Sequence, residues 1–229
     1  MQQLPLGVHL RANAVFASFA PGRNASALAA VRALVSAGGG APVWLWGGAG
    51  SGKTHLLQAA LAEWSDTRGP AAYLPLGLPG LHPSMLAGLE NCGLLALDEV
   101  DAVAGNAALE IALFHLWNGL LERGAAVLLA ARQPPAGVAI ALPDLASRFA
   151  SSLVLQLQTP DEAELLEVLR VMAAQRGLEL GPEVAAFLLR RLRRDTHELA
   201  ALVERLDAAA MAAQRALTVP FVREVIGAG

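Results

Sequence analysis

The stretch that decides the fold is Gly47-Gly48-Ala49-Gly50-Ser51-Gly52-Lys53-Thr54. It fits G-x-x-x-x-G-K-[ST], the phosphate-binding loop, in which glycines let the backbone approach an anion closely. The apolar run 42–46 before it predicts a buried strand, and the residues from His55 onward have helical spacing. The free N–H groups at the start of such a helix favour an anion. We predict that this loop and His55 bind a nucleotide, with Lys53 near the phosphates and Thr54 on Mg²⁺.

A second informative stretch is Gly93-Leu94-Leu95-Ala96-Leu97-Asp98-Glu99, in which an apolar run leads directly into two acids. This pattern predicts a buried parallel strand, whose carboxyl end is where α/β proteins place ligands. Asp98 is the candidate second contact to Mg²⁺, and Glu99 is the candidate for orienting or deprotonating an attacking water. An apolar run followed by acids also occurs where a helix begins, so this pattern alone is ambiguous. Its place after the glycine-rich loop strengthens the nucleotide interpretation.

The remaining pattern predicts an α/β domain followed by helices alone. Further strands are expected at 71–76, 125–131 and 151–157, and helices at 25–37, 83–90 and 106–123. Asn24 or Ser26 is the predicted cap of the first helix, and Arg132 follows a strand where a polar residue often reaches the γ-phosphate. After Thr159, a predicted helix cap, we expect helices at 160–176, 182–193, 195–215 and 219–227. The predicted organisation is a tail (1–12), an α/β domain (13–158) and a helical domain (159–229).

The composition limits the class of protein. The 229 residues are 55% hydrophobic and 16% charged, and the net charge of −3 excludes a strongly basic nucleic-acid binder. A single cysteine, Cys92, cannot form an internal disulfide, and neither it nor the scattered histidines have zinc-ligand spacing. The sequence lacks a signal-peptide pattern and an apolar run of about 20 residues, so we expect a cytoplasmic protein with no membrane partner.

The order of these features resembles the AAA+ ATPases, and more narrowly their DnaA/Hda branch. Three stretches carry the narrower resemblance: Phe16-Ala17-Ser18-Phe19 with Pro21-Gly22-Arg23-Asn24, the stretch Leu142-Pro143-Asp144-Leu145-Ala146-Ser147-Arg148, and residues 213–222. The resemblance implies a P-loop AAA+ domain with a parallel sheet, an all-α lid, and binding of ADP or ATP with Mg²⁺. It also implies that Arg148 is an arginine finger acting in trans, and that His197 occupies the nucleotide-sensing position of the lid. The family often has an acid where this chain has Arg132.

The tail resembles a further motif of the family's short, Hda-type members. Gln3-Leu4-Pro5-Leu6 is similar to the clamp-binding peptide Gln-Leu-x-Leu-(Phe/Leu), which implies contact with the DNA polymerase III sliding clamp (β subunit) through Gln3, Leu4 and Leu6. From the residues alone, a tail packed on its own domain is equally open. The chain shows no helix-turn-helix pattern after the lid, so we expect no direct DNA-binding domain.

Three functions are compatible with these features. The resemblance implies a negative regulator of replication initiation that, with the DNA-loaded clamp, uses Arg148 to stimulate ATP hydrolysis by its partner DnaA. A self-contained ATPase would instead use Glu99 on its own ATP, with Arg148 completing the site in a homo-oligomer. A DnaA-like recruitment adapter is the third. Arg148 could also form only a surface ion pair.

Overall fold

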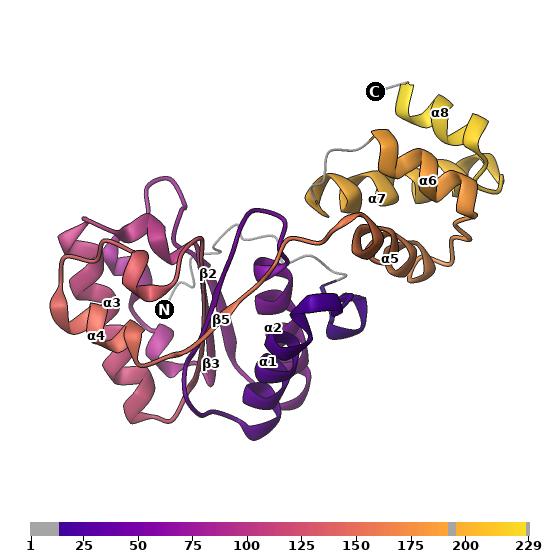
Figure 1. The fold of residues 1–229 in the computed structure, drawn as a ribbon. Helices are drawn as coiled ribbons and strands as arrows, with labels where there is room; N and C mark the ends of the chain where they lie inside the picture. The colour runs from indigo at the N-terminus through magenta and orange to yellow at the C-terminus, as the bar shows by residue number, and fades with distance from the viewer. Residues whose placement is uncertain (1–13, 192–195, 228–229) are drawn as a thin grey trace.

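The computed structural model describes residues 14–191 and 196–227, which form a sheet covered by helices and a smaller helical lid (Figure 1). In these ranges the sheet has five parallel strands in the order β2-β3-β4-β1-β5. The strands are β1 (Val43–Trp46), β2 (Ala71–Pro75), β3 (Leu94–Asp98), β4 (Ala126–Ala131) and β5 (Leu153–Gln156). The helices that accompany them are α1 (Ala25–Ala37), α2 (Lys53–Thr67), α3 (Ala107–Glu122) and α4 (Pro143–Ala150). The predicted parallel α/β architecture is confirmed.

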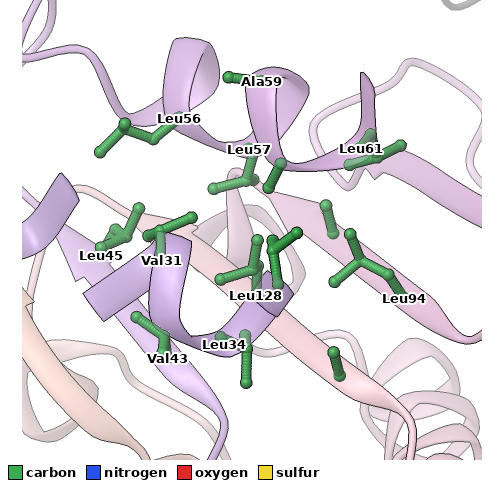
Figure 2. Packing of buried hydrophobic residues seen from close by; sticks show 14 of the residues in the cluster. Val31, Leu34, Val43, Leu45, Leu56, Leu57, Ala59, Leu61, Leu94 and Leu128 are labelled. Carbon is green, nitrogen blue, oxygen red and sulfur yellow. The ribbon is translucent and has the colours of Figure 1, made fainter. Parts of the chain in front are cut away.

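Helices cover both faces of the sheet, and this explains the composition of its strands. Every residue of β3 and β4 is buried, as expected for parallel strands covered on both sides. α1 and α2 cover one face, where Figure 2 shows Val31, Leu34 and Leu57 of the helices packed over Leu45 and Leu128 of the strands. This apolar layer holds the start of α2, and with it the phosphate-binding loop, against the end of β1.

Three aromatic side chains organise the opposite face. Trp44 of β1, Trp117 of α3 and Phe149 of α4 are almost fully buried in one cluster. The ring of Phe149 lies 5.1 Å from that of Trp44 and 5.5 Å from that of Trp117. Tilted aromatic contacts of this kind add to the stability that area burial provides. The short helix α4 is therefore fixed to both the sheet and α3.

The lid consists of α5 (Glu162–Ala174), α6 (Pro182–Arg191), α7 (Thr196–Ala213) and α8 (Val219–Gly227), which confirms the four predicted helices. It has a core of its own, made of buried aliphatic side chains from all four helices: Leu165, Leu169, Leu188, Leu202, Leu206 and Val222. Residues 157–161 connect this lid to β5. The exact domain boundaries stay a prediction, and the tail 1–12 lies outside the described residues.

Between β2 and β3 the predicted helix at 83–90 is wrong. Two separate 3-10 turns lie there, Pro83–Leu86 and Leu89–Asn91, with Gly88 between them. Gly88 has a φ of +89°, a left-handed conformation that a continuous right-handed helix does not accommodate. The backbone of this glycine therefore divides the segment.

Two predicted helix caps are also wrong. α5 begins after Asp161 rather than after Thr159, because Asp161 and Glu164 form a reciprocal capping box in which each side chain accepts from the other's backbone N–H at 3.0 Å. Asn24 stands before α1 without capping it. Its side-chain amide instead donates to the carbonyl of Gln158 (2.9 Å) and its carbonyl oxygen accepts from the N–H of Gln158 (2.8 Å).

Among the described residues, no helix is both long enough and apolar enough to span a bilayer.

Candidate nucleotide-binding site

The phosphate-binding loop joins β1 to α2. Close contacts leave no room for a side chain at two of its glycines. A Cβ on Gly47 would lie 2.2 Å from the carbonyl oxygen of Leu157, and one on Gly52 would lie 2.7 Å from the ring of Phe19. Both glycines also have positive φ values, +156° and +96°. The loop thus lies between the segment after β5 and the segment before α1. Side chains at Gly47 and Gly52 would push the loop away from both segments.

Lys53 lies at the start of α2 with its ammonium folded into the loop. Its Nζ donates to the carbonyl oxygens of Gly47 and Gly48, each at 2.8 Å. Burial lowers the pKa of Lys53 below its usual value, while the nearby carboxylates of Asp98 and Asp101 act in the opposite direction. A partly buried cation whose closest hydrogen bonds go to backbone carbonyl oxygens would gain from a direct anionic partner, which is what a phosphate group provides.

Asp98 ends β3 as a buried carboxylate with three hydrogen-bond donors. Its Oδ2 accepts from the hydroxyl of Thr54 (2.6 Å) and from that of Tyr73 (2.8 Å), and its Oδ1 accepts from the backbone N–H of Glu99 (2.9 Å). Burial, followed by the charge of Asp98, raises the pKa of the Tyr73 phenol well above its usual value. Sequence reasoning missed Tyr73. The only indication of its role in the sequence was a hydroxyl group within an otherwise apolar strand.

The residues predicted to hold Mg²⁺ fit that ion. The Thr54 hydroxyl and the Asp98 carboxylate are hard oxygen donors and lie in contact. Mg²⁺ in nucleotide sites takes few protein ligands and completes its shell with water and phosphate oxygens. A pair of oxygen donors beside a phosphate-binding loop is therefore sufficient, although no cluster of three or more His, Cys, Asp or Glu side chains occurs in the described part of the chain.

Glu99 and Arg132 lie at the ends of neighbouring strands, and both border the same cavity. Glu99 has a φ of +54°, a left-handed conformation that is uncommon for a residue with a side chain. The end of its side chain lies against Gly77, since a Cβ built on that glycine would be 2.3 Å from Oε2 of Glu99. Arg132 is largely exposed, and its Nε lies 3.9 Å from a carboxylate oxygen of Asp101.

The cavity, of about 230 Å³, lies at the carboxyl ends of the strands between the phosphate-binding loop and the lid. Besides residues of the loop, Asp98 and Glu99, its walls include Ser18, Phe19, Ala20, Asn24, Pro160, Val168 and Met172. Val168 and Met172 come from α5, and sequence reasoning missed them because apolar residues at helical spacing are typical of any helix core. The apolar and aromatic side of this cavity suits a planar base, and its loop side suits phosphates.

His55 borders the cavity and contacts the segment before α1. Its Nε2 lies 3.1 Å from the hydroxyl of Ser18 and 3.1 Å from the carbonyl oxygen of Val15. Its ring centroid is 5.8 Å from that of Phe19. His55 thus links α2 to the aromatic wall of the cavity.

The structure brings most of the predicted nucleotide residues together. The cavity is lined by Ala49, Gly50, Ser51, Gly52, Lys53, Thr54, His55, Asp98 and Glu99. Gly47 and Gly48 belong to the same loop and accept the Lys53 hydrogen bonds. The predicted Gln3, Leu4 and Leu6 lie outside the described residues, and so does the side chain of His197, whose backbone is part of α7.

Arg148 does not line the cavity. It lies on α4 with an exposed side chain, and none of the described residues forms an ion pair or hydrogen bond with its guanidinium. The neighbouring Leu145 and Phe149 are fully buried, so the helix is fixed while this side chain faces away from the core. Figure 1 shows α4 on the face of the sheet opposite to α1 and α2.

Two family models match this chain. The model of the lid domain of Hda matches residues 161–226, and the model of the bacterial DnaA ATPase domain matches residues 10–71. The chain is an Hda-like homologue of DnaA. The matched segments include the phosphate-binding loop of this Hda-like protein and all of the lid apart from its last helical residue, and they assign it to a family of replication-initiation regulators.

Three solved structures share the fold of this Hda-like protein. Domain III of the Thermotoga maritima replication initiation protein DnaA is 24% identical, with a TM-score of 0.80, over 96% of this chain and 98% of that one. AMPPCP-bound DnaA from Aquifex aeolicus is 24% identical, with a TM-score of 0.70, over 86% of this chain and 66% of that one. The Thermotoga maritima RuvB Holliday junction branch migration motor is 19% identical, with a TM-score of 0.65, over 90% of this chain and 67% of that one. These similarities establish the AAA+ fold.

Proposed function

We propose that this Hda-like protein stimulates ATP hydrolysis by DnaA and thereby inhibits the initiation of replication. In this proposal the DNA-loaded sliding clamp tethers it near DnaA. Its own nucleotide, ADP or ATP with Mg²⁺, is a structural cofactor in the site between α2 and the lid. The membership of the DnaA/Hda family supports the choice of DnaA as the partner.

The observation that carries the proposal is the position of Arg148. Its guanidinium is exposed outside the protein's own nucleotide cavity, on a helix anchored by the buried Phe149. A guanidinium is charged at any physiological pH and has a fixed planar geometry. Such a cation, supplied in trans to the charge that develops on a transferring phosphoryl group, accelerates hydrolysis by about 10³–10⁵-fold. An unpaired arginine on an anchored helix suits this role.

The cofactor part of the proposal rests on the loop and its neighbours. Lys53 and the loop N–H groups would hold the phosphates, and Thr54 with Asp98 would hold Mg²⁺, which supplies charge neutralisation when bound. The AMPPCP bound by the Aquifex aeolicus DnaA supports an adenine nucleotide. Arg132 and His197 are proposed as further contacts to the phosphates, and alanine variants of each should weaken binding of a triphosphate more than that of a diphosphate.

The test of the main proposal is phosphate release by purified ATP-bound DnaA with this protein, ADP and DNA-loaded clamp. Arg148→Ala should abolish the stimulation while nucleotide affinity stays unchanged. Arg123→Ala removes another exposed arginine of the same domain and serves as the matched control. Stimulation that survives in Arg148→Ala would show that another group supplies the charge.

The clamp part is tested separately. Removal of residues 1–8, or the substitution of Gln3, Leu4 and Leu6 by alanine, should abolish stimulation in the presence of loaded clamp. At high concentration of the protein the tailless variant should regain activity, because a tether acts by raising effective concentration. Equal stimulation with and without the tail at low concentration would exclude the tether.

A second candidate is a self-contained ATPase, favoured by the position of Glu99. Its carboxylate borders the nucleotide cavity beside Asp98, where it could activate a water. Turnover by this chain alone that is lost in Glu99→Gln would support this function. If that turnover also rises with protein concentration and falls in Arg148→Ala, a homo-oligomer completes the site.

A further inference from the structure

Glu110 is a buried carboxylate with no place in the nucleotide site. It lies in the first turn of α3 and is only 1% exposed. Its Oε1 accepts from the backbone N–H of Gly105 (2.8 Å) and of Ala141 (3.2 Å), and its Oε2 accepts from that of Leu142 (2.7 Å). The carboxylate therefore joins the loop before α3 to the loop before α4.

These hydrogen bonds keep Glu110 ionised in an apolar setting. Burial by itself would raise the pKa of this carboxyl, but the three backbone N–H donors outweigh it and lower the pKa below the usual value. A buried carboxylate without such donors would be costly or would take up a proton. Since an ionised carboxylate only accepts hydrogen bonds, all three N–H groups can be satisfied at once.

The segment that Glu110 holds leads directly into the helix of Arg148. α4 begins at Pro143, which has no N–H, and Leu142 before it forms no side-chain cap. Pro143 presets one backbone φ at the start of α4, but no side chain of the preceding residue caps it. The two N–H groups just before it, those of Ala141 and Leu142, are instead held by Glu110 from the neighbouring α3.

We propose that Glu110 is the positioning residue for Arg148. Two anchors fix α4: the Glu110 carboxylate at its start, and Leu145 with Phe149 in the core along its length. Glu110 acts through the backbone and has no contact with a reacting group. This inference rests on the proposed function of Arg148 in trans, since it assigns the residue that holds this arginine in place for DnaA-bound ATP.

Glu110→Gln is the sharpest variant because it keeps the shape of the side chain. Its NH₂ group would replace one oxygen and face a backbone N–H, so at least one hydrogen bond is lost and two donors oppose each other. Misplacement of a catalytic group by about 1 Å can cost about 10²-fold in rate. We expect the stimulated rate of DnaA at saturating protein to fall by about 10- to 100-fold, with half-saturation and affinity for fluorescent ADP within about twofold of wild type. Glu122→Gln, at the exposed end of α3, is the matched control.

Two additional measurements separate positioning from general destabilisation. In Glu110→Gln/Arg148→Ala the rate should be no lower than in Arg148→Ala alone, because both changes remove the same contribution. Amide hydrogen exchange should show faster exchange at Gly105 and Leu142 in the variant, with protection in the core strands unchanged. If Glu110→Gln does not fold, Glu110→Asp replaces it in the experiment. Asp keeps the charge but holds the carboxylate farther from the three N–H groups, and the variant should show a smaller loss of stimulation.

The outcomes are distinguishable. Wild-type protein that fails to stimulate DnaA would overturn the proposed function and this inference together. Stimulation that depends on Arg148 but is unchanged in Glu110→Gln would overturn the inference alone. A loss of ADP affinity as large as the loss of stimulation would also overturn it, because Glu110 would then serve the whole domain rather than the position of Arg148.

Discussion

Arg23 and Glu164 connect the α/β domain to the lid beside the nucleotide cavity. The guanidinium of Arg23 donates to Oε2 of Glu164 from Nη2 at 2.9 Å and from Nε at 3.2 Å, and the backbone N–H of Arg23 donates to Oε1 at 3.0 Å. The same guanidinium donates to the carbonyl of Thr159 in the connection to the lid. Several charge-assisted hydrogen bonds between the same two residues restrict the direction in which the lid leaves the sheet.

We predict that this contact dominates the titration of Glu164. The hydrogen bonds from Arg23, more than any other effect, lower the pKa of Glu164 to about 2. Because the folded-state pKa lies below the unfolded value, the contribution to stability is complete above about pH 4.5 and is lost as the pH falls towards 2. The side-chain carboxyl ¹³C shift should report a pKa near 2 in wild-type protein and a clearly higher pKa in Arg23→Ala, which keeps only the backbone N–H donors of residues 23 and 161. Arg123→Ala should leave it unchanged, and a wild-type pKa near 4 would contradict the contact.

Tyr73 allows a spectroscopic test of the Asp98 site because it is the only tyrosine of the chain. Burial and the Asp98 carboxylate raise the pKa of its phenol above the usual value. The absorbance change near 295 nm should therefore not appear at pH 10 in the folded protein, and should appear near pH 10 in urea. Since the folded-state pKa is raised, the contribution of Tyr73 to stability is complete below about pH 10 and declines above it. A normal titration of the folded protein would mean that Tyr73 is neither buried nor bonded to Asp98.

Gly47 and Gly69 form a pair that separates contact from backbone strain. Both have positive φ, but a Cβ on Gly47 would meet the carbonyl oxygen of Leu157, whereas one on Gly69 would meet nothing within 4 Å. Gly69→Ala should cost only the strain, roughly 1–3 kcal/mol. Gly47→Ala should lower thermal stability further and reduce the affinity for fluorescent ADP by about tenfold or more, since the loop must move. Equal effects of the two substitutions would show that the contact with Leu157 is unimportant.

Phe149 should be essential for the fold around α4. Its replacement by alanine leaves a cavity between Trp44 and Trp117, and such changes cost about 3–5 kcal/mol. For a domain of this size each kcal/mol lowers the melting temperature by about 2–4 °C. Ile111→Ala, at an exposed position of α3, should stay within about 0.5 kcal/mol of wild type. A small loss in Phe149→Ala would show that α4 is held mainly by other contacts.

Much of the fold follows from local pattern. The eight residues from Gly47 to Thr54 predict their own conformation because glycine spacing, a preceding apolar run and a following helix are all contiguous in the chain. The end of β3 at Asp98 is predicted for the same reason, since a short apolar run followed by acids is typical of a buried parallel strand. The four lid helices follow from apolar spacing between glycines and prolines.

Local pattern fails where two equally good partners compete. Asn24 is a good helix cap by residue type, but in the folded chain its amide meets the backbone of Gln158, 134 residues away. Thr159 and Asp161 are both suitable caps, and the reciprocal bond to Glu164 selects Asp161. Propensity ranks such residues too closely to choose, so contacts made elsewhere decide.

The sequence by itself thus determined the α/β class, the phosphate-binding loop, the Asp98-Glu99 strand end and the helical lid, because each depends on residues adjacent in the chain. Only the tertiary structure decided which polar side chains meet. Tyr73 donates to Asp98 across 25 residues, Glu110 holds Leu142 across 32, and Arg23 binds Glu164 across 141. The physical reason is that a hydrogen bond depends on a distance of about 3 Å in space, and separation along the chain does not specify that distance.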